Sequence, residues 1–345
     1  MSSSKKLLQS ASGFIDQSGS LNVEDVFSID TFFDSNNSAD DAGRTITNGI
    51  DLAGEGGLVW VKSRTSVQSH SLTDTVRGAS VRLGVDTTAA NATGSKYDKV
   101  DQFNNNGFRY PNGFVTAQDY VAWTFRKAPK FFDLKSWSGN GTAGRQISHD
   151  LDADVGMIII KATNISQNWF VWHKDLNTNQ WLALSENYGL ATTGTHTYLN
   201  NTNPTSSVIT LGSDNVVNGN GNTYIGYFFA HDTSDEGMIQ CGTYVGNGSA
   251  TAGPHINLGF EPQWLLVKST ADSTNWSISD TMRGLHHGNE INLIYPHLDN
   301  AEASISTTPS QVAPTSTGFQ VNATGTNFNT NSAYYLYLAI RKAPM

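Results

Sequence analysis

The feature that most constrains the fold of this chain is a set of sequence landmarks that recurs three times in the same order. Each set begins with a short strand-like run before a turn rich in Gly and Asn: FSIDTFFDSN from Phe27, FDLKSWSGNGTAG from Phe132 and IQCGTYVGNGSATAG from Ile239. Each set closes with an aromatic run: YVAWTF from Tyr120, YIGYFF from Tyr224 and YLYLAI from Tyr335. Repetition of this kind indicates that one structural unit occurs several times in the chain.

Two further landmarks lie between the opening and closing runs. The strings GLVWVKS, GMIIIKA and QWLLVKS each contain a lysine near their end: Lys62, Lys161 and Lys268. Eight residues after each lysine comes a ring-bearing residue: His70, Trp169 and Trp276. The sets lie about 107 residues apart. The sequence therefore predicts repeats over residues 25–131, 132–238 and 239–345, preceded by an N-terminal segment of residues 1–24.

Within each repeat the apolar residues alternate with a period of two. Trp276 and Ile278 fall on one face of a strand, and Ser277 and Ser279 fall on the other. Such runs, bounded by Gly, Asn and Pro, indicate β-strands. Roughly six to eight strands in a unit of this size are typical of a β-sandwich or jelly roll. We therefore expect an all-β protein made of three tandem β-sandwich, jelly-roll-like repeats.

The closing run differs because it is apolar on both faces. In the first repeat Tyr120 and Ala122 fall on one face, whereas Val121, Trp123 and Phe125 fall on the other. A strand buried on both faces lies beneath a second layer, so repeats or subunits should pack on one another. On this basis we expect a homo-oligomer, a trimer or larger.

The joints between repeats point to a rigid arrangement. The sequence RKAPKFFDLKSW joins the first two repeats without a Gly/Ser-rich linker. A flexible tether has a different composition. The repeats are expected to stand rigidly, end to end or side by side.

Composition excludes several classes of protein. The net charge is −9 and only 15% of residues are charged, whereas a nucleic-acid binder needs a basic face. The single cysteine, Cys241, allows no intrachain disulfide. The longest apolar runs, such as Val155–Ile160, are too short to cross a bilayer. We expect neither nucleic-acid binding nor membrane insertion.

The motifs that suggest chemistry are weak. The string GNGTAG (Gly139–Gly144) matches a dinucleotide-binding pattern, but a strand and turn follow it instead of a helix. It therefore predicts a hairpin turn and no cofactor. No His/Cys spacing typical of zinc and no G-x-S-x-G string occurs. The acidic runs 34–41 and 232–236 lack the calcium-loop register and are interpreted as solvated turns. We predict no catalytic residue, no metal site and no enzyme activity.

Two pairs of charged residues stand at the same place in the first and third repeats. Asp74 and Arg77 lie in TDTVRG, and Asp280 and Arg283 lie in SDTMRG. They could clamp a ligand, or form an ion pair that orders the loop before the next strand. Their recurrence favours the structural role. The second repeat lacks the string and has His173 in its place.

Phe170 and Trp172 are the candidate binding residues. They fall on the strand face that carries Ser277 and Ser279 in the third repeat. Exposed aromatic rings could form a platform on which a sugar stacks. Alternatively, a neighbouring repeat could cover them.

Several of these strings are similar to a known group of proteins. The run RKAPKFFDLKSWSGNGTAGRQISHDL…GMIIIKA, followed by YFFAHD…IQCGTYVGNGS and LGFEPQWLLVKS, closely resembles tail-fibre-like and virion structural proteins of marine tailed bacteriophages. Those of cyanophages and pelagiphages are the most similar, and KKLLQSASG and NGIDLAGEGGLVWVKSR belong to the same likeness. The resemblance covers nearly the whole chain. It implies a β-rich, repeat-built component of an appendage or of the outer particle surface, and it carries no catalytic residues.

These observations lead to three hypotheses about function. The first is a surface-exposed virion structural protein, assembled in the host cytoplasm, that acts in host attachment as part of a tail fibre or appendage. Residues 1–24 would dock on other virion proteins, and the ligand would be a host surface glycan or protein. An exposed aromatic or Asn-rich patch at one end is then expected.

The second hypothesis is a capsid decoration (cement or fibre) protein that stabilises the head, with its largest interface on the capsid. The third is a polysaccharide depolymerase with two converging carboxylates in a cleft.

Overall fold

The computed structural model describes residues 21–34, 43–93, 99–111, 117–193, 198–271, 273–286, 290–306 and 311–343. Most of the predicted N-terminal arm (residues 1–20) and most of the acidic run 34–41 lie outside these residues. The described helices are one-turn elements of four residues, α2 (Val23–Val26) and α3 (Leu52–Glu55). All pairings between the described strands are antiparallel. The predicted all-β class is confirmed.

The strands fall into three groups, which we call segments 1, 2 and 3 after the predicted ranges 25–131, 132–238 and 239–345. Segment 1 contains β1 (Phe27–Asp34), β2 (Arg44–Thr47), β3 (Gly57–Ser63), β4 (Ser71–Asp74), β5 (Gln102–Asn104), β6 (Gly107–Tyr110) and β7 (Gln118–Arg126). Segment 2 contains β8 (Phe132–Ser138), β9 (Arg145–Ser148), β10 (Asp154–Ala162), β11 (Phe170–His173), β12 (Gln180–Ala183), β13 (Ala191–Thr192), β14 (Val208–Leu211) and β15 (Thr223–His231). Segment 3 contains β16 (Ile239–Val245), β17 (His255–Asn257), β18 (Pro262–Ser269), β19 (Trp276–Asp280), β20 (Glu290–Leu293), β21 (Ala303–Ser306), β22 (Val312–Thr315), β23 (Gly318–Val321) and β24 (Tyr334–Arg341).

One large sheet dominates each segment, and the three large sheets share one strand order. Their orders are β1-β7-β3-β4, β8-β15-β10-β11-β12-β13 and β16-β24-β18-β19. In each sheet the first strand of the segment pairs with its last strand, which pairs with the third, which pairs with the fourth. The aromatic closing runs are thus the interior strands β7, β15 and β24. Segment 2 extends this pattern by two short strands.

A smaller sheet faces the large sheet in each segment. The small sheets are β2-β6-β5, β9-β14 and β17-β23-β22, and β20 and β21 form a further pair. Apolar side chains fill the space between the two sheets. In segment 1, Val59 and Val61 of β3 pack with Ile46 and Phe108, and the core of segment 3 is built in the same way.

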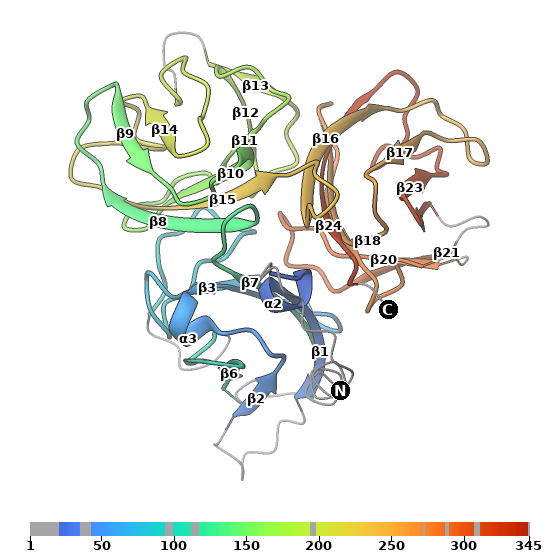
Figure 1. Cartoon of the computed structure of the whole chain (residues 1–345), viewed down its shortest axis with the longest axis horizontal. Coiled ribbons are helices and arrows are strands. Elements are labelled where there is room, and N and C mark those ends of the chain that lie inside the picture. Colours follow the sequence, from blue (N-terminus) through green and yellow to red (C-terminus); the bar gives the residue numbers. More distant parts are fainter. Residues whose placement is uncertain are drawn as a thin grey trace.

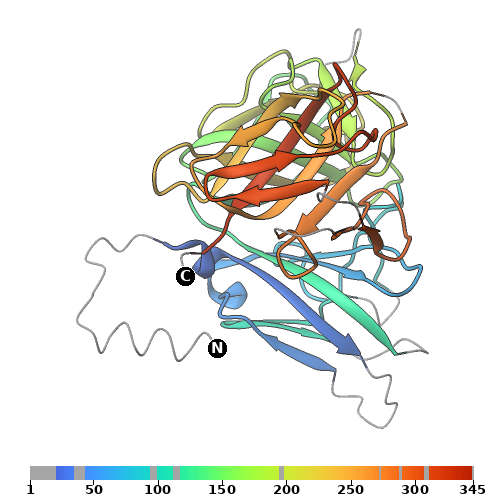
Figure 2. The ribbon, with the colours of Figure 1, turned by 90° about the vertical axis from the view of Figure 1, so that its right-hand side faces the viewer.

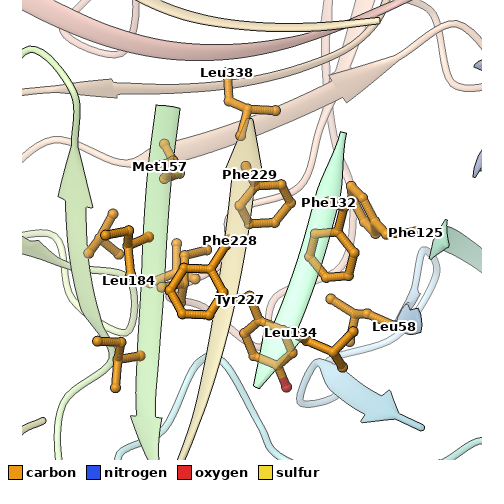
Figure 3. Close-up of a cluster of buried hydrophobic side chains, with 14 of the residues drawn as sticks. Leu58, Phe125, Phe132, Leu134, Met157, Leu184, Tyr227, Phe228, Phe229 and Leu338 are labelled. Carbon is orange, nitrogen blue, oxygen red and sulfur yellow. The ribbon is translucent and has the colours of Figure 1, made fainter. Parts of the chain in front are cut away.

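The other face of each large sheet points toward the middle of the molecule. Figure 1 shows the three segments around a common centre. One continuous apolar cluster there joins all three, including Leu58, Phe125, Phe132, Tyr227 and Leu338 (Figure 3). The segments therefore lie side by side. The second apolar face of each closing strand is covered inside this chain, so that face requires no second copy of the protein.

We call this arrangement of the three segments around one centre the ring. Its two ends carry different parts of the chain. Figure 2 shows α2 and the last residues of β24 at the same end, which we call the termini end. At the opposite end Asp34 pairs with Gln118, Ser138 with Thr223 and Val245 with Tyr334. We call this the loop end, because it carries the connections that follow β8, β16, β3, β10 and β18.

The GNGTAG turn differs from the prediction. It does not form a hairpin, because β8 pairs with β15 whereas β9 pairs with β14. The turn crosses from the large sheet to the small one. The side-chain amide of Asn218 fixes it by donating to Asn140 Oδ1 at 3.1 Å and to Thr142 O at 3.0 Å. Asn329 makes the equivalent contacts with Asn247 and Ser249.

Candidate functional site

The charged pairs singled out in the sequence form buried ion pairs. Asp74 and Asp280 are 0% exposed and end strands β4 and β19. Arg77 Nε donates to Asp74 Oδ2 at 2.6 Å, and Arg283 Nε donates to Asp280 Oδ2 at 2.7 Å. Backbone N–H groups of the following turn, including that of Met282 at 3.1 Å, donate to the second carboxylate oxygen. The ordering role predicted for these pairs therefore has a clear structural basis.

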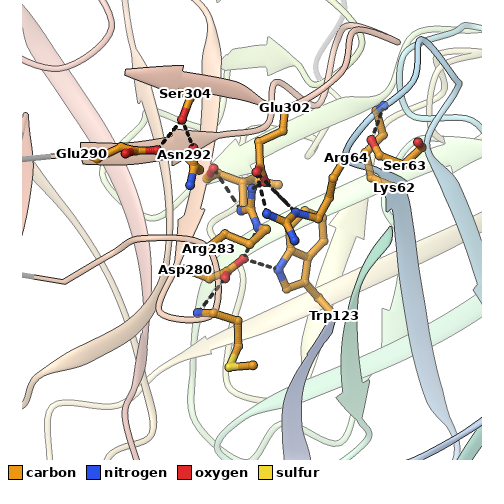
Figure 4. Close-up of polar contacts among 12 residues, drawn as sticks. Lys62, Ser63, Arg64, Trp123, Asp280, Arg283, Glu290, Asn292, Glu302 and Ser304 are labelled. Atoms are coloured by element: carbon orange, nitrogen blue, oxygen red, sulfur yellow. Dashed lines mark hydrogen bonds and ion pairs between the residues drawn. The ribbon is translucent and has the colours of Figure 1, made fainter. Parts of the chain in front are cut away.

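Each carboxylate also accepts a hydrogen bond from the neighbouring segment. Tyr227 Oη donates to Asp74 Oδ2 at 2.8 Å. Trp123 Nε1 donates to Asp280 Oδ2 at 2.8 Å, and the guanidinium of Arg283 lies 5.3 Å from the centre of the Trp123 ring (Figure 4). Burial raises the pKa of the Tyr227 hydroxyl well above its usual value, which keeps it a donor. The pairs thus join segments as well as ordering turns.

His173 stands at the corresponding position in segment 2. It lies opposite Met157 in the sheet, as Asp74 lies opposite Leu58 and Asp280 opposite Trp264. Its Nδ1 accepts from the N–H of Asp175 at 3.2 Å. The Nε2–H therefore donates to the backbone oxygen of Tyr337 in segment 3, at 3.1 Å. Burial lowers the pKa of His173 to about 4.

These three contacts run around the ring in one direction. The end of β4 in segment 1 contacts β15 of segment 2. The end of β11 in segment 2 contacts β24 of segment 3, and the end of β19 in segment 3 contacts β7 of segment 1. We call the three contact regions the seams. Each seam buries a polar group that has a partner, as a buried polar group requires.

The side chains of His70, Trp169 and Trp276 connect the segments in the opposite direction. Trp169 Nε1 donates to Gly84 O in segment 1 at 3.0 Å, and Trp276 Nε1 donates to Ala183 O in segment 2 at 2.8 Å. His70 Nε2 lies 3.2 Å from Leu298 O in segment 3, while its Nδ1 accepts from Trp60 Nε1 at 2.9 Å. The landmark eight residues after the lysine is therefore a donor to the preceding segment of the ring.

The landmark lysines are buried beside these contacts. Lys62 Nζ donates to Asp299 O at 3.2 Å and Lys161 Nζ donates to Thr88 O at 3.0 Å, both across a seam. Burial lowers the pKa of each of these two amines to about 8. Lys268 Nζ bonds Thr274 within its own segment, at 3.0 Å to the backbone oxygen. Because backbone oxygens occupy these amines, we interpret them as structural.

A charged network adds to the seam between segments 3 and 1. Glu302 accepts from Arg283 Nη1 at 2.8 Å and from Arg64 Nη2 at 2.8 Å (Figure 4). The two guanidinium groups lower the pKa of the Glu302 carboxyl despite its burial. This carboxylate therefore links segments 1 and 3 through its ion pairs with Arg64 and Arg283.

The structure places Phe170 and Trp172 inside segment 2. Their side chains are 1% and 4% exposed, so neither offers a ring face to a sugar. Phe170 packs against Trp181 and Tyr198, with ring centres 6.3 and 5.2 Å apart. A stacking platform at this position is therefore excluded by burial. The rings that cover Phe170 come from the same segment, whose added strand β12 carries Trp181.

Exposed apolar side chains gather instead at the loop end. Among the described residues, five of the seven large apolar side chains that are exposed belong to this end: Phe33, Val67, Tyr188, Val245 and Tyr334. The other two, Val76 and Met282, lie at the termini end. Sequence reasoning missed the five because each sits at the end of an alternating run or in a connection, where period does not indicate exposure.

The described residues contain no group of three or more His, Cys, Asp or Glu side chains placed to hold a metal ion. Within the same part of the chain, no helix is long and apolar enough to span a membrane. The carboxylates of Asp74 and Asp280 each pair with an arginine at a different seam.

Comparison with known proteins identifies one family. Residues 30–344 match the model of a family described as a domain of unknown function, DUF7483. The chain belongs to this family. No curated protein and no solved structure matches it. The DUF7483 match runs from β1 to beyond β24 and so includes all three large sheets. The unit that this family describes is therefore the whole ring, and not one segment of it.

Proposed function

We propose that this DUF7483 protein is a structural component of a bacteriophage particle that is exposed on the virion surface. It would act in host attachment as part of a tail fibre or appendage. The single observation that carries this proposal is the contrast between the two ends of the ring. The loop end presents exposed aromatic side chains among Asn- and Thr-rich connections, as a surface for attachment should. The resemblance to virion proteins of marine phages supports the same role.

We also propose that the three segments are copies of one β-sandwich module of jelly-roll type, about 107 residues long. The shared strand order supports this proposal. So do the matched turns held by Asn218 and Asn329. The modules would occupy residues 25–131, 132–238 and 239–345.

The termini end has the composition of a docking surface. Its connections are charged with both signs: RKAPK at 126–130, HDLDAD at 149–154 and HDTSDE at 231–236. Lys127 and Lys135, for example, both pair with Asp150, at 2.9 and 2.7 Å. Residues 21–24 lie at this end, and residues 1–24 would bind other virion proteins. The loop end would then point away from the particle.

The proposed role requires no catalysis. Asp74 and Asp280, two of the three described aspartates that are 0% exposed, already hold an arginine and an aromatic donor each. They serve different seams, whereas a depolymerase needs two carboxylates that converge on one bond. The third hypothesis therefore has the least structural support.

Localisation on intact particles tests the proposal. Antibodies raised against the loop-end peptide 246–254 would be conjugated to gold and imaged on virions by electron microscopy. We expect gold at a tail fibre or appendage, and we expect the purified protein to reduce phage adsorption to host cells. Gold over the head, with adsorption unchanged, would favour the capsid decoration protein. Absence of gold from particles shown to contain the chain would contradict surface exposure.

A further inference from the structure

The loop end of the seam between segments 2 and 3 has two exposed tyrosines, Tyr334 and Tyr188. Tyr334 begins β24 and lies directly opposite Val245 at the end of β16. The side chains of Tyr334 and Val245 are 60% and 47% exposed. They continue the sheet face that, farther along β24, carries Leu336 and Leu338 into the central cluster. The apolar interior thus reaches the surface at this point.

A chain of hydrogen bonds holds the second tyrosine near the first. The N–H of Thr270 donates to Tyr334 O at 2.9 Å. The oxygen of Thr270 in turn accepts from the N–H of Leu190 at 2.8 Å. The N–H of Thr274 donates to Asn187 O at 3.3 Å, so the connection that carries Tyr188 is attached at two points. These bonds therefore anchor the backbone on both sides of Tyr188, which is 56% exposed, beside the start of β24.

The connections at this end that belong to segments 2 and 3 carry little charge. Residues 163–168, 184–190, 213–222, 246–254, 270–275 and 322–333 contain three acidic residues and no lysine or arginine. Asn, Thr, Ser and Gly make up most of them. Amides and hydroxyls can donate and accept hydrogen bonds without requiring a charged partner. A phosphate- or carboxylate-bearing ligand would need basic groups that these connections lack.

Aromatic rings and neutral hydrogen-bonding groups together suit one class of ligand. A sugar ring has an apolar C–H face that can lie on a tyrosine ring, and hydroxyl groups that bond amides and hydroxyls at its edge. We infer that the surface around Tyr188, Val245 and Tyr334 binds a neutral polysaccharide chain. This inference rests on the proposed role in host attachment and names the ligand class for it.

Binding of the full chain to defined polysaccharides tests this inference. The probes are dextran, mannan, a neutral galactan and the neutral polysaccharide fraction of host envelopes, with alginate and heparin as anionic counterparts. Affinity electrophoresis should show retardation by at least one neutral probe. The dissociation constant should change less than twofold between 50 and 500 mM NaCl, because charge contributes little.

Three variants and a control assign the site. Tyr334→Ala and Tyr188→Ala should each weaken binding at least tenfold, whereas Tyr334→Phe, which keeps the ring, should remain within about threefold of the native protein. Met282→Ala is the matched control, because Met282 is 55% exposed at the termini end. Circular dichroism and thermal melting should be the same for all four. Native affinity in both alanine variants would overturn the inference, as would retardation by the anionic probes alone or by no probe.

The same variants separate this inference from the proposed function. If the purified protein blocks phage adsorption and the two alanine variants block it equally well, host attachment stands and the polysaccharide site is wrong. Adsorption blocked only by a host protein fraction would likewise assign the loop end to a protein receptor. If the protein neither blocks adsorption nor is found on the particle surface, the proposed function itself fails.

Discussion

Replacing Asp280 with alanine should destabilise the protein far more than removal of a surface carboxylate. Asp280 is 0% exposed and accepts from Arg283 at 2.7 Å, from Trp123 at 2.8 Å and from the N–H of Met282 at 3.1 Å. Its loss leaves the indole N–H without an acceptor and Arg283 with Glu302 as its remaining carboxylate. Breaking a buried ion pair by removal of one partner costs about 3–5 kcal/mol.

Equilibrium unfolding in urea, followed by tryptophan fluorescence, measures this cost in the full chain. The control is Asp101→Ala, because Asp101 pairs with Arg109 at 2.7 Å but the two side chains are 19% and 39% exposed. Such a pair contributes about 0–1 kcal/mol. Trp123→Phe removes the donor and keeps most of the ring. In a double-mutant cycle with Asp280→Ala it should couple by about 1–3 kcal/mol. A cost for Asp280→Ala within about 1 kcal/mol of the control, or additive effects in the cycle, would refute the role given to this seam.

Three further predictions concern acid, packing and chemical access. Burial lowers the pKa of His173 and His297 to about 4, so between pH 6.5 and 4 the unfolded chain binds protons that the folded chain does not. The melting temperature should therefore fall as the pH is lowered over this window, and it should fall less in His173→Gln. A melting temperature that does not change with pH would contradict the burial of these side chains. Phe170→Ala should lower the free energy of unfolding by about 3–5 kcal/mol because a cavity replaces the ring, and a cost below 1 kcal/mol would mean that the ring is not packed. Cys241 is buried in the central cluster, and burial raises the pKa of its thiol. A maleimide should therefore label it in urea but not in the native protein. Rapid labelling of the native protein would mean that this cluster is open to solvent.

Much of the fold could be predicted from sequence because its cause is local. The period of two and the turn residues around it indicate strands directly, and the all-β class follows. The two apolar faces of the closing run, such as Tyr120 and Val121, correctly predicted a second covering layer. They could not say whether that layer belongs to the same chain, because alternation reports burial and not the identity of the neighbour.

The seams could not be predicted because their partners are distant in sequence. Asp74 and Tyr227 are separated by 153 positions, and only the assembled ring brings them together. The pair with Arg77, three residues away, was visible in the string TDTVRG. For Phe170 and Trp172, alternation alone could not decide between exposure and burial, since β12 and Tyr198 cover that face and have no counterpart in the sequence pattern. The GNGTAG turn was assigned to a hairpin because closeness in sequence favours one, whereas Asn218 directs the chain to the other sheet.

The ring in a single chain has a consequence for how its contacts can change. In a trimer of separate identical chains, a substitution at one boundary is repeated at the other two. Here each boundary is encoded independently, so His173 can occupy one of them while aspartates keep the others. Such a protein can acquire a specialised boundary, such as the one that carries Tyr188 and Tyr334, without altering the other two.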